Sequence, residues 1–193
     1  MNLPNKLSVL RMIMVPIFVV IMMLPIGIWS SIIGVALFII ASLTDMLDGK
    51  IARKYNLITD FGKFIDPLAD KFMVIGALLV ILYKYETIRP IFIWAVIIVI
   101  FRELAVTSIR LVASSSSGVV IAANWLGKIK TCTQIACVCA VIIEPLIYMI
   151  PGLEFMVAYL PLTYLTTVLM IIFTLWSGIN YIVSYWKYLD PQK

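Results

Sequence analysis

Four aspartates, two glycines and one arginine stand at fixed spacings in the segment 45–70 of this chain. The pattern is D-x-x-D-G-x-x-A-R, eight further residues, and G-x-x-x-D-x-x-x-D, with Asp45, Asp48, Asp66 and Asp70 as its acidic members. The surrounding sequence is apolar, and each carboxylate placed inside a bilayer costs about 2.5 to 3.5 kcal/mol on insertion scales. A metal ion, a proton or a substrate must offset that cost, so we expect the functional site here.

Helical spacing explains how this array can act as one site. Residues three, four and seven apart share one face of a helix, so Asp45 and Asp48 line a stripe with Gly49 and Ala52. The other two aspartates form a second stripe on the next helix. A short loop near residues 56–60 would bring the two pairs of carboxylates face to face.

Magnesium or manganese ions suit this set of oxygen ligands. Carboxylates that converge without a cation repel one another and take up protons, whereas one or two such ions bind them and keep positions for phosphate. The chain has no histidine and the array has no cysteine, so zinc and copper are poor candidates. Gly49 and Gly62 allow a bulky ligand to approach the backbone, and Arg53 has the planar donor geometry that suits a phosphate.

These residues also have structural interpretations. Asp66 followed by Pro67 is typical of a helix start, with aspartate as the N-cap and proline at the first position. Gly49 and Gly62 would suit close helix packing in a membrane, and Arg53 would suit the cytoplasmic flank of a span. Such interpretations explain single residues but not four carboxylates at regular helical spacing, and we therefore favour the functional one.

The elements that must position the array are predicted to be membrane-spanning helices. Of the 193 residues, 63% are hydrophobic and 13% are charged, and the mean hydropathy is +1.09, which excludes an ordinary soluble domain. Apolar stretches near the length of about 20 residues that crosses a bilayer lie at about 10–29, 31–47, 64–83, 90–112, 131–150 and 156–186. We predict an all-α integral membrane protein, a bundle of six transmembrane helices in one domain over residues 1–193. Charge interrupts the second and third helices near one end.

The distribution of basic residues predicts which membrane face holds the array. Lysine and arginine near helix ends are retained in the cytoplasm. If six helices cross the membrane in alternating directions, most of the basic residues of this chain fall on one side. Only Lys84 and Arg89 fall clearly on the other side. Both termini and the aspartates are then cytoplasmic, and the net charge of +5 suits a face with anionic headgroups of membrane lipids. Because the basic residues are scattered among the spans, no nucleic-acid partner is expected.

The array resembles the signature of the CDP-alcohol phosphatidyltransferase family, and every fixed position of that signature is matched. Its members are integral membrane enzymes with six transmembrane helices, usually homodimers, that transfer a phosphatidyl or similar group from a CDP-linked donor to an alcohol and release CMP. The resemblance implies that the four aspartates hold a pair of divalent ions, Mg²⁺ or Mn²⁺, and that Asp70 also acts as general base on the acceptor hydroxyl. It implies a CDP-lipid site at Gly49, Ala52, Arg53 and Gly62.

Three further segments are similar to those of bacterial phosphatidylglycerophosphate synthases, a branch of that family: PNKLSVLR at 4–11, RELAVTSIR at 102–110 and GKIKT at 127–131. This resemblance implies CDP-diacylglycerol as donor, sn-glycerol 3-phosphate as acceptor and a bacterial cytoplasmic membrane. A dianionic acceptor explains basic residues at the membrane face better than a neutral one does. The expected acceptor-binding residues are Ser8, Arg11, Arg102, Arg110, Lys128, Lys130 and Thr131. Ser8 stands where threonine is more usual, a change that keeps the hydroxyl.

Alternatives stay open from the sequence alone. Within the family, the acceptor alternatives are serine, an inositol phosphate and phosphatidylglycerol. A small cation transporter would also place aspartates in membrane helices, although an arginine beside a cation path is a poor choice. The basic residues of the acceptor set would also suit the cytoplasmic flanks of the spans.

Overall fold

The computed structural model describes residues 2–55, 59–117 and 125–186, apart from the side chains of residues 48, 50–54, 60, 63 and 113–117. In these ranges the chain forms six long α-helices and one short 3-10 helix. They are α1 (Leu3–Met23), α2 (Ile28–Lys54), α3 (Asp60–Lys84), α4 (Arg89–Ser117), α5 (Trp125–Ile147), η1 (Glu154–Ala158) and α6 (Pro161–Tyr185). The predicted all-α bundle with six long helices is confirmed.

Five of the helices are long and apolar enough to cross a membrane, namely α1, α2, α4, α5 and the segment that contains α6. The exception is α3, in which Asp66, Asp70 and Lys71 interrupt the apolar sequence. Charge near one end of this helix was expected from the sequence. The helix α3 packs against α1, α4 and α5, and Asp66, Asp70 and Lys71 are half-buried on it.

The first helix begins earlier than hydropathy indicates, at Leu3 and not near residue 10. The side chain of Asn2 caps it by accepting a hydrogen bond from the Asn5 backbone N–H at 3.2 Å. Pro4 stands in the first turn, where its missing N–H leaves no intrahelical bond unmade. The polar stretch that contains Ser8 and Arg11 is therefore helical, and its side chains have fixed positions on α1.

The protein buries a continuous apolar core and leaves other large apolar side chains facing outward. Phe18, Phe38, Leu78, Phe92 and Ile142 belong to the core, and each is at most 4% exposed. Large outward-facing side chains occur on every long helix, among them Trp29, Phe72, Trp94, Phe101, Trp125 and Trp176. An apolar outer surface on this scale is unsuited to water and suited to lipid.

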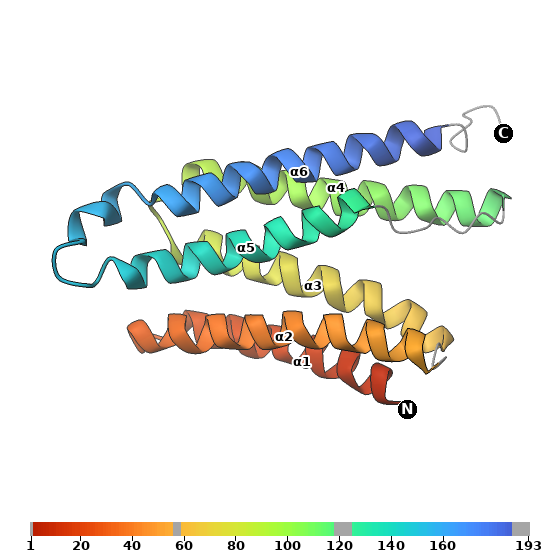
Figure 1. The fold of residues 1–193 in the computed structure, drawn as a ribbon, viewed down its shortest axis with the longest axis horizontal. Helices are drawn as coiled ribbons and strands as arrows, with labels where there is room; N and C mark the ends of the chain where they lie inside the picture. The colour runs from red at the N-terminus through yellow and green to blue at the C-terminus, as the bar shows by residue number, and fades with distance from the viewer. Residues whose placement is uncertain (1, 56–58, 118–124, 187–193) are drawn as a thin grey trace.

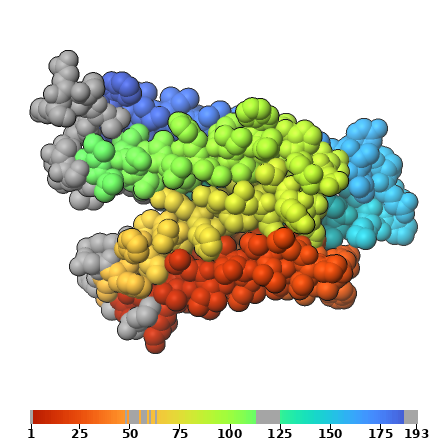
Figure 2. All heavy atoms as spheres, turned by 180° about the vertical axis from the view of Figure 1, so that it is seen from behind, coloured from red at the N-terminus to blue at the C-terminus, as the bar shows by residue number. Residues whose placement is uncertain are grey.

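The helices form two groups that meet along α3 and where α2 contacts α5. The group α1, α2 and α3 packs together, α4 and α5 both pack on α6, and α3 contacts α4 and α5 between the groups (Figure 1). Figure 2 shows α3 in yellow between α1 in red and α4 in green, with the surface hollowed between α3 and α4 at one end. This is the end at which α1 begins and α2 ends, and it holds the aspartate array.

Candidate functional site: an aspartate array around a buried arginine

Two carboxylates of the array meet around a buried guanidinium group. Arg11 on α1 has no exposed side-chain surface, and its Nη1 lies 2.6 Å from Asp45 Oδ1 on α2. The same nitrogen donates a hydrogen bond to Asp70 Oδ1 on α3. The side chain of Asp45 is 34% exposed and that of Asp70 is 49% exposed, so both carboxylates keep an open side. Three helices thus bring two of the predicted metal ligands to one cation.

Asp66 is held beside this pair by the same first helix. Ser8, which is fully buried, donates its hydroxyl to Asp66 Oδ1. Ser8 and Arg11 are neighbours on one face of α1, as Asp66 and Asp70 are on α3, because residues three and four apart lie on the same side of a helix. The segment 4–11 therefore orients Asp66 and Asp70, the two aspartates of the array that lie on α3.

The structure excludes the interpretation of Asp66 as a helix cap. The helix α3 begins at Asp60, and Thr59 is its N-cap, whose hydroxyl accepts a hydrogen bond from the Gly62 N–H at 3.0 Å. Pro67 therefore lies inside the helix, well after its first turn. Asp66 is consequently free of a capping role, and its carboxylate faces Ser8.

Gly62 lies where α3 packs closely on the start of α1. A Cβ atom at this position would be 2.9 Å from Asn5 Oδ1 and 3.2 Å from Thr59 Oγ1, closer than side-chain atoms normally come. Asn5 is itself buried and donates to Thr59 Oγ1 at 2.9 Å. The packing interpretation of Gly62 thus has direct support. Gly49 is half-buried on α2. The side chains of Asp48, Ala52 and Arg53 lie outside the described residues.

A second polar cluster lies on the other group of helices. Glu103 on α4 accepts hydrogen bonds from Arg102 Nη1 at 3.1 Å and from the ammonium group of Lys130 on α5. Arg102 also donates to the Ser177 hydroxyl on α6 at 2.7 Å. Gly178 makes room for the arginine, because a Cβ there would be 3.1 Å from Arg102 Cγ. All three charged residues are at most 9% exposed.

The structure does not bring the remaining expected acceptor residues into this cluster. Arg110 is exposed on α4, and its Nε donates to the Tyr181 hydroxyl at 3.0 Å. Lys128 is exposed, with its Nζ 5.9 Å from the centroid of the Trp125 ring. Thr131 donates its hydroxyl to the Gly127 carbonyl at 3.1 Å, a bond within α5. Of the seven expected acceptor residues, Arg102 and Lys130 share one cluster, whereas Ser8 and Arg11 contact the aspartates.

The donor atoms of the array fit a divalent cation. Among the side chains that the structure describes, which do not include that of Asp48, no three His, Cys, Asp or Glu residues group closely enough to hold one metal ion. Asp45 and Asp70 nevertheless converge on a single positive group, the Arg11 guanidinium. Carboxylates that turn toward one cation from two helices are the oxygen donors that Mg²⁺ and Mn²⁺ accept.

Several residues that contact the predicted site residues were not themselves predicted: Asn5, Thr59, Glu103, Ser177, Gly178 and Tyr181. Glu103 carried a usable signal, because it stands beside Arg102 within an apolar run. Ser177 and Tyr181 lie about 70 positions from their arginine partners. Nothing in local spacing indicates such a contact.

Comparisons with known proteins agree with the sequence signature. The model of the family described as CDP-alcohol phosphatidyltransferase matches residues 1–176. The chain is similar to the CDP-diacylglycerol–glycerol-3-phosphate 3-phosphatidyltransferase of Bacillus subtilis (strain 168), with 42% identity over 99% of this chain and 98% of that protein. It is also similar to the enzyme of the same name from Escherichia coli (strain K12), with 32% identity over 94% of this chain and 93% of that protein. The enzyme of that name from Yersinia enterocolitica is 30% identical over 99% of each chain.

Proposed function

The chain belongs to the CDP-alcohol phosphatidyltransferase family, and on that premise we propose that it transfers the phosphatidyl group of CDP-diacylglycerol to sn-glycerol 3-phosphate, giving phosphatidylglycerophosphate and CMP. The observation that carries this proposal is the pairing of two clusters: carboxylates of α2 and α3 converge on one cation, and buried cations lie on α4 and α5, the helices that α3 contacts on its other side. Family membership favours an enzyme over a cation transporter. The names of the relatives support glycerol 3-phosphate over other acceptors.

The aspartate array would bind the diphosphate of the donor. The family is generally dependent on a divalent metal ion, and we propose that Asp45, Asp48, Asp66 and Asp70 hold Mg²⁺ or Mn²⁺, two ions in all. Bound there, the metal would neutralise charge on the diphosphate and make CMP a better leaving group. Gly49, Ala52, Arg53 and Gly62 would lie beside the cytidine nucleotide. Ser8 and Arg11 would orient the carboxylates, a role that their observed contacts support better than the expected binding of the acceptor phosphate.

Asp70 would accept the proton of the acceptor hydroxyl. Its carboxylate is half-exposed, and Arg11 engages one of its oxygens, which fixes its position. The acceptor oxygen would attack the phosphorus on the lipid side of the diphosphate. As the new P–O bond forms, the bond to the CMP oxygen breaks, CMP leaves with that electron pair and the hydroxyl proton passes to Asp70. No covalent enzyme intermediate is required.

The cluster on α4, α5 and α6 would bind the acceptor phosphate. Arg102 and Lys130 share the single charge of Glu103, so the three residues carry one net positive charge at a site with little solvent. A buried positive charge needs an anionic partner, and the phosphate of glycerol 3-phosphate supplies one. Arg110 and Lys128 are exposed in the same region of α4 and α5 and would attract the acceptor from solvent.

The protein is an integral membrane protein, and we propose the bacterial cytoplasmic membrane as its location, with the array on the cytoplasmic side. The distribution of basic residues supports that orientation. The C-terminus, also expected on that side, lies outside the described residues. A homodimer is our expectation from the family.

The proposal is tested with purified protein in detergent, CDP-diacylglycerol and Mg²⁺ or Mn²⁺. CMP release and the lipid product are followed by mass spectrometry with separate acceptors. We expect phosphatidylglycerophosphate with glycerol 3-phosphate alone. Release of CMP with serine, an inositol phosphate or phosphatidylglycerol would keep the family and overturn the assigned acceptor. No release with any acceptor would overturn the assigned reaction.

A further inference from the structure

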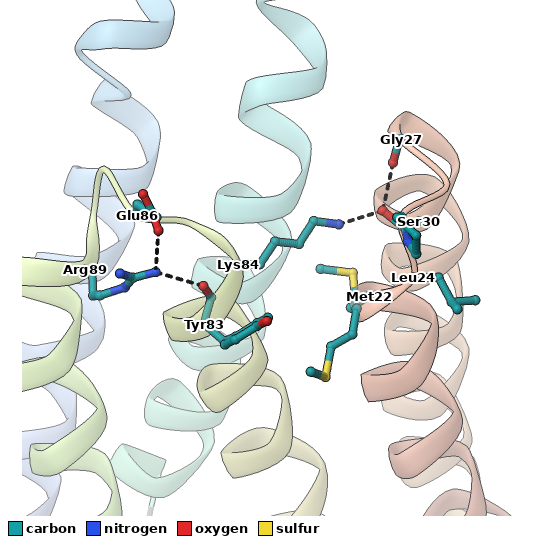
Figure 3. Close-up of a pocket in the computed structure, with 10 residues that line it drawn as sticks. Met22, Leu24, Gly27, Ser30, Tyr83, Lys84, Glu86 and Arg89 are labelled. Carbon is teal, nitrogen blue, oxygen red and sulfur yellow. Dashed lines mark hydrogen bonds and ion pairs between the residues drawn. The ribbon is translucent and has the colours of Figure 1, made fainter.

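A cavity of about 440 Å³ lies at the end of the bundle opposite the aspartate array. It opens between the turn that joins α1 to α2 and the turn that joins α3 to α4 (Figure 3). Lys84 in its wall lies 14 positions after Asp70 on α3, which is about 21 Å along a helix axis. The cavity is therefore separate from the proposed reaction site and lies at the other membrane face.

Two basic side chains face this cavity, and Figure 3 shows Lys84 reaching across it from α3 toward Ser30. The Lys84 ammonium donates to the Ser30 hydroxyl at 2.6 Å and to the Ser31 hydroxyl at 3.3 Å. Within the described part of the chain, Lys84 forms no ion pair with a carboxylate. Its charge is thus held in place by neutral groups and left without a counter-ion.

Arg89 is the second basic group, and its orientation is fixed by the backbone of α3. It donates to the Leu82 carbonyl at 3.1 Å and to the Tyr83 carbonyl at 2.9 Å. Its ion pair with Glu86 is long, 3.3 Å, and the Glu86 side chain is 82% exposed, so this pair is weak. With Lys84, Arg89 and Glu86 in its wall, the cavity carries one net positive charge.

Two further features favour an anionic ligand with an apolar part. The helix α2 begins at Ile28, beside the cavity, and has no acidic residue in its first turn, so its positive end is not neutralised. Met22, Met23 and Leu24 form the apolar part of the wall. These positions lie where α1 ends and α2 begins, the level at which lipid headgroups meet acyl chains.

We propose that this cavity binds the phosphodiester headgroup of an anionic phospholipid from the leaflet opposite the active site. Lys84, held in place by Ser30, and Arg89 would contact the phosphate oxygens, and the exposed side chains of Met23 and Leu24 would contact the start of the acyl chains. A free phosphate ion offers the same kind of oxygen acceptors but no apolar part to contact the apolar wall. The proposal does not depend on the activity assigned to the aspartate array.

The test is lipid binding to the intact protein in detergent, followed by native mass spectrometry and thermal unfolding. Phosphatidylglycerol, phosphatidylethanolamine and inorganic phosphate serve as separate probes. We expect phosphatidylglycerol to bind and to raise the melting temperature more than the other two. Lys84→Gln should weaken this binding about tenfold, as expected for the loss of one charge-assisted hydrogen bond, and Lys84→Arg should restore it.

Two matched variants separate a local effect from a change in net charge. Glu86→Gln removes the negative charge at the cavity and should strengthen phosphatidylglycerol binding about twofold. Lys6→Gln removes one positive charge, as Lys84→Gln does, but Lys6 lies near the start of α1, far from the cavity. This variant should leave phosphatidylglycerol binding unchanged. Equal binding of the two phospholipids, or equal effects of Lys6→Gln and Lys84→Gln, would overturn the proposal. An equal thermal shift with inorganic phosphate would overturn the assignment to a lipid.

Discussion

Arg11 is the single residue on which the geometry of the aspartate array depends most. Arg11→Gln would leave Asp45 and Asp70 facing each other without the cation that they share. Breaking a fully buried ion pair costs about 3–5 kcal/mol, and the half-open carboxylates reduce that figure here. We expect a clear fall in the melting temperature of the metal-free protein, and Mn²⁺ should restore part of it because it supplies positive charge at the same carboxylates.

Thermal unfolding in detergent, with EDTA or with Mn²⁺, measures this effect of Arg11. Arg110→Gln is the matched control, since it removes an exposed arginine and should change the melting temperature little. If Arg11→Gln lowered the melting temperature equally under both conditions, Arg11 would not act as a counter-ion for metal-binding carboxylates.

The role of Asp70 as general base predicts the behaviour of Asp70→Asn. The amide keeps the size and one oxygen of the side chain but cannot accept the hydroxyl proton, so CMP release should fall by about 10²–10⁴-fold. Binding of CDP-diacylglycerol, measured in the presence of Mn²⁺, shows whether the donor site survives the change. Retained turnover together with unimpaired donor binding would contradict the assignment.

Substitution of Arg110 tests the proposed attraction of the acceptor. Arg110 is exposed, and within the described part of the chain its side chain hydrogen-bonds to Tyr181 and lies over the Tyr181 ring, so its removal should not disturb the core. Arg110→Ala should raise the KM for glycerol 3-phosphate about tenfold at low salt, because it removes a charge that would attract the anionic acceptor, and should leave the KM for CDP-diacylglycerol unchanged. Tyr181→Phe, which removes the hydroxyl that holds Arg110, should have a smaller effect of the same kind. An unchanged dependence on the acceptor would argue against this role of Arg110.

At the scale of elements, the start of α6 depends on a carboxylate from α5. Glu144 is 1% exposed and accepts hydrogen bonds from the backbone N–H groups of Leu162, at 2.8 Å, and Thr163, at 2.6 Å. It therefore does for α6 what an N-cap side chain does for an ordinary helix. The Tyr148 hydroxyl donates to the same carboxylate at 2.8 Å.

Glu144→Gln should therefore destabilise the protein by about 1–3 kcal/mol. The amide has one acceptor oxygen in place of two, so a buried N–H group at the helix start loses its partner, and the favourable interaction with the helix dipole is weakened. Thermal unfolding measures the loss, and hydrogen exchange at the first turn of α6 locates it. Glu154→Gln, at an exposed position in η1, is the control. Equal melting temperatures for both variants would contradict the capping role.

The elements themselves were largely predictable, whereas the contacts between them were not. Hydropathy located six helices because each apolar stretch has the length of a membrane span, but it missed the polar first turns of α1, which Asn2 caps. Local spacing also suggested Asp66 as a possible helix N-cap, but the N-cap of α3 is Thr59. The ion pairs of Arg11 and the bond from Arg102 to Ser177 depend on how distant helices pack, which no local pattern records.

At the scale of the whole molecule, the two groups of helices carry complementary parts of the proposed reaction. The carboxylates lie on α2 and α3, beside α1, and the buried cations lie on α4 and α5, beside α6. The groups diverge at the end that holds both clusters (Figure 2). A donor held by one group and an acceptor held by the other would therefore meet in the hollow between α3 and α4.

The orientation of this bundle in the membrane gives a last prediction. Lys6 and Glu86 lie at opposite ends of the bundle, and both are exposed, so cysteine at either position should be tolerated. In intact bacteria, a membrane-impermeant maleimide should label Glu86→Cys but not Lys6→Cys, which should react only after permeabilisation, because basic residues gather at the Lys6 end. The wild-type protein gives the background from Cys132, Cys137 and Cys139 on α5. The reverse pattern would place the aspartate array outside the cell, away from cytoplasmic CDP-linked substrates, and labelling of both positions from one side would contradict the bundle itself.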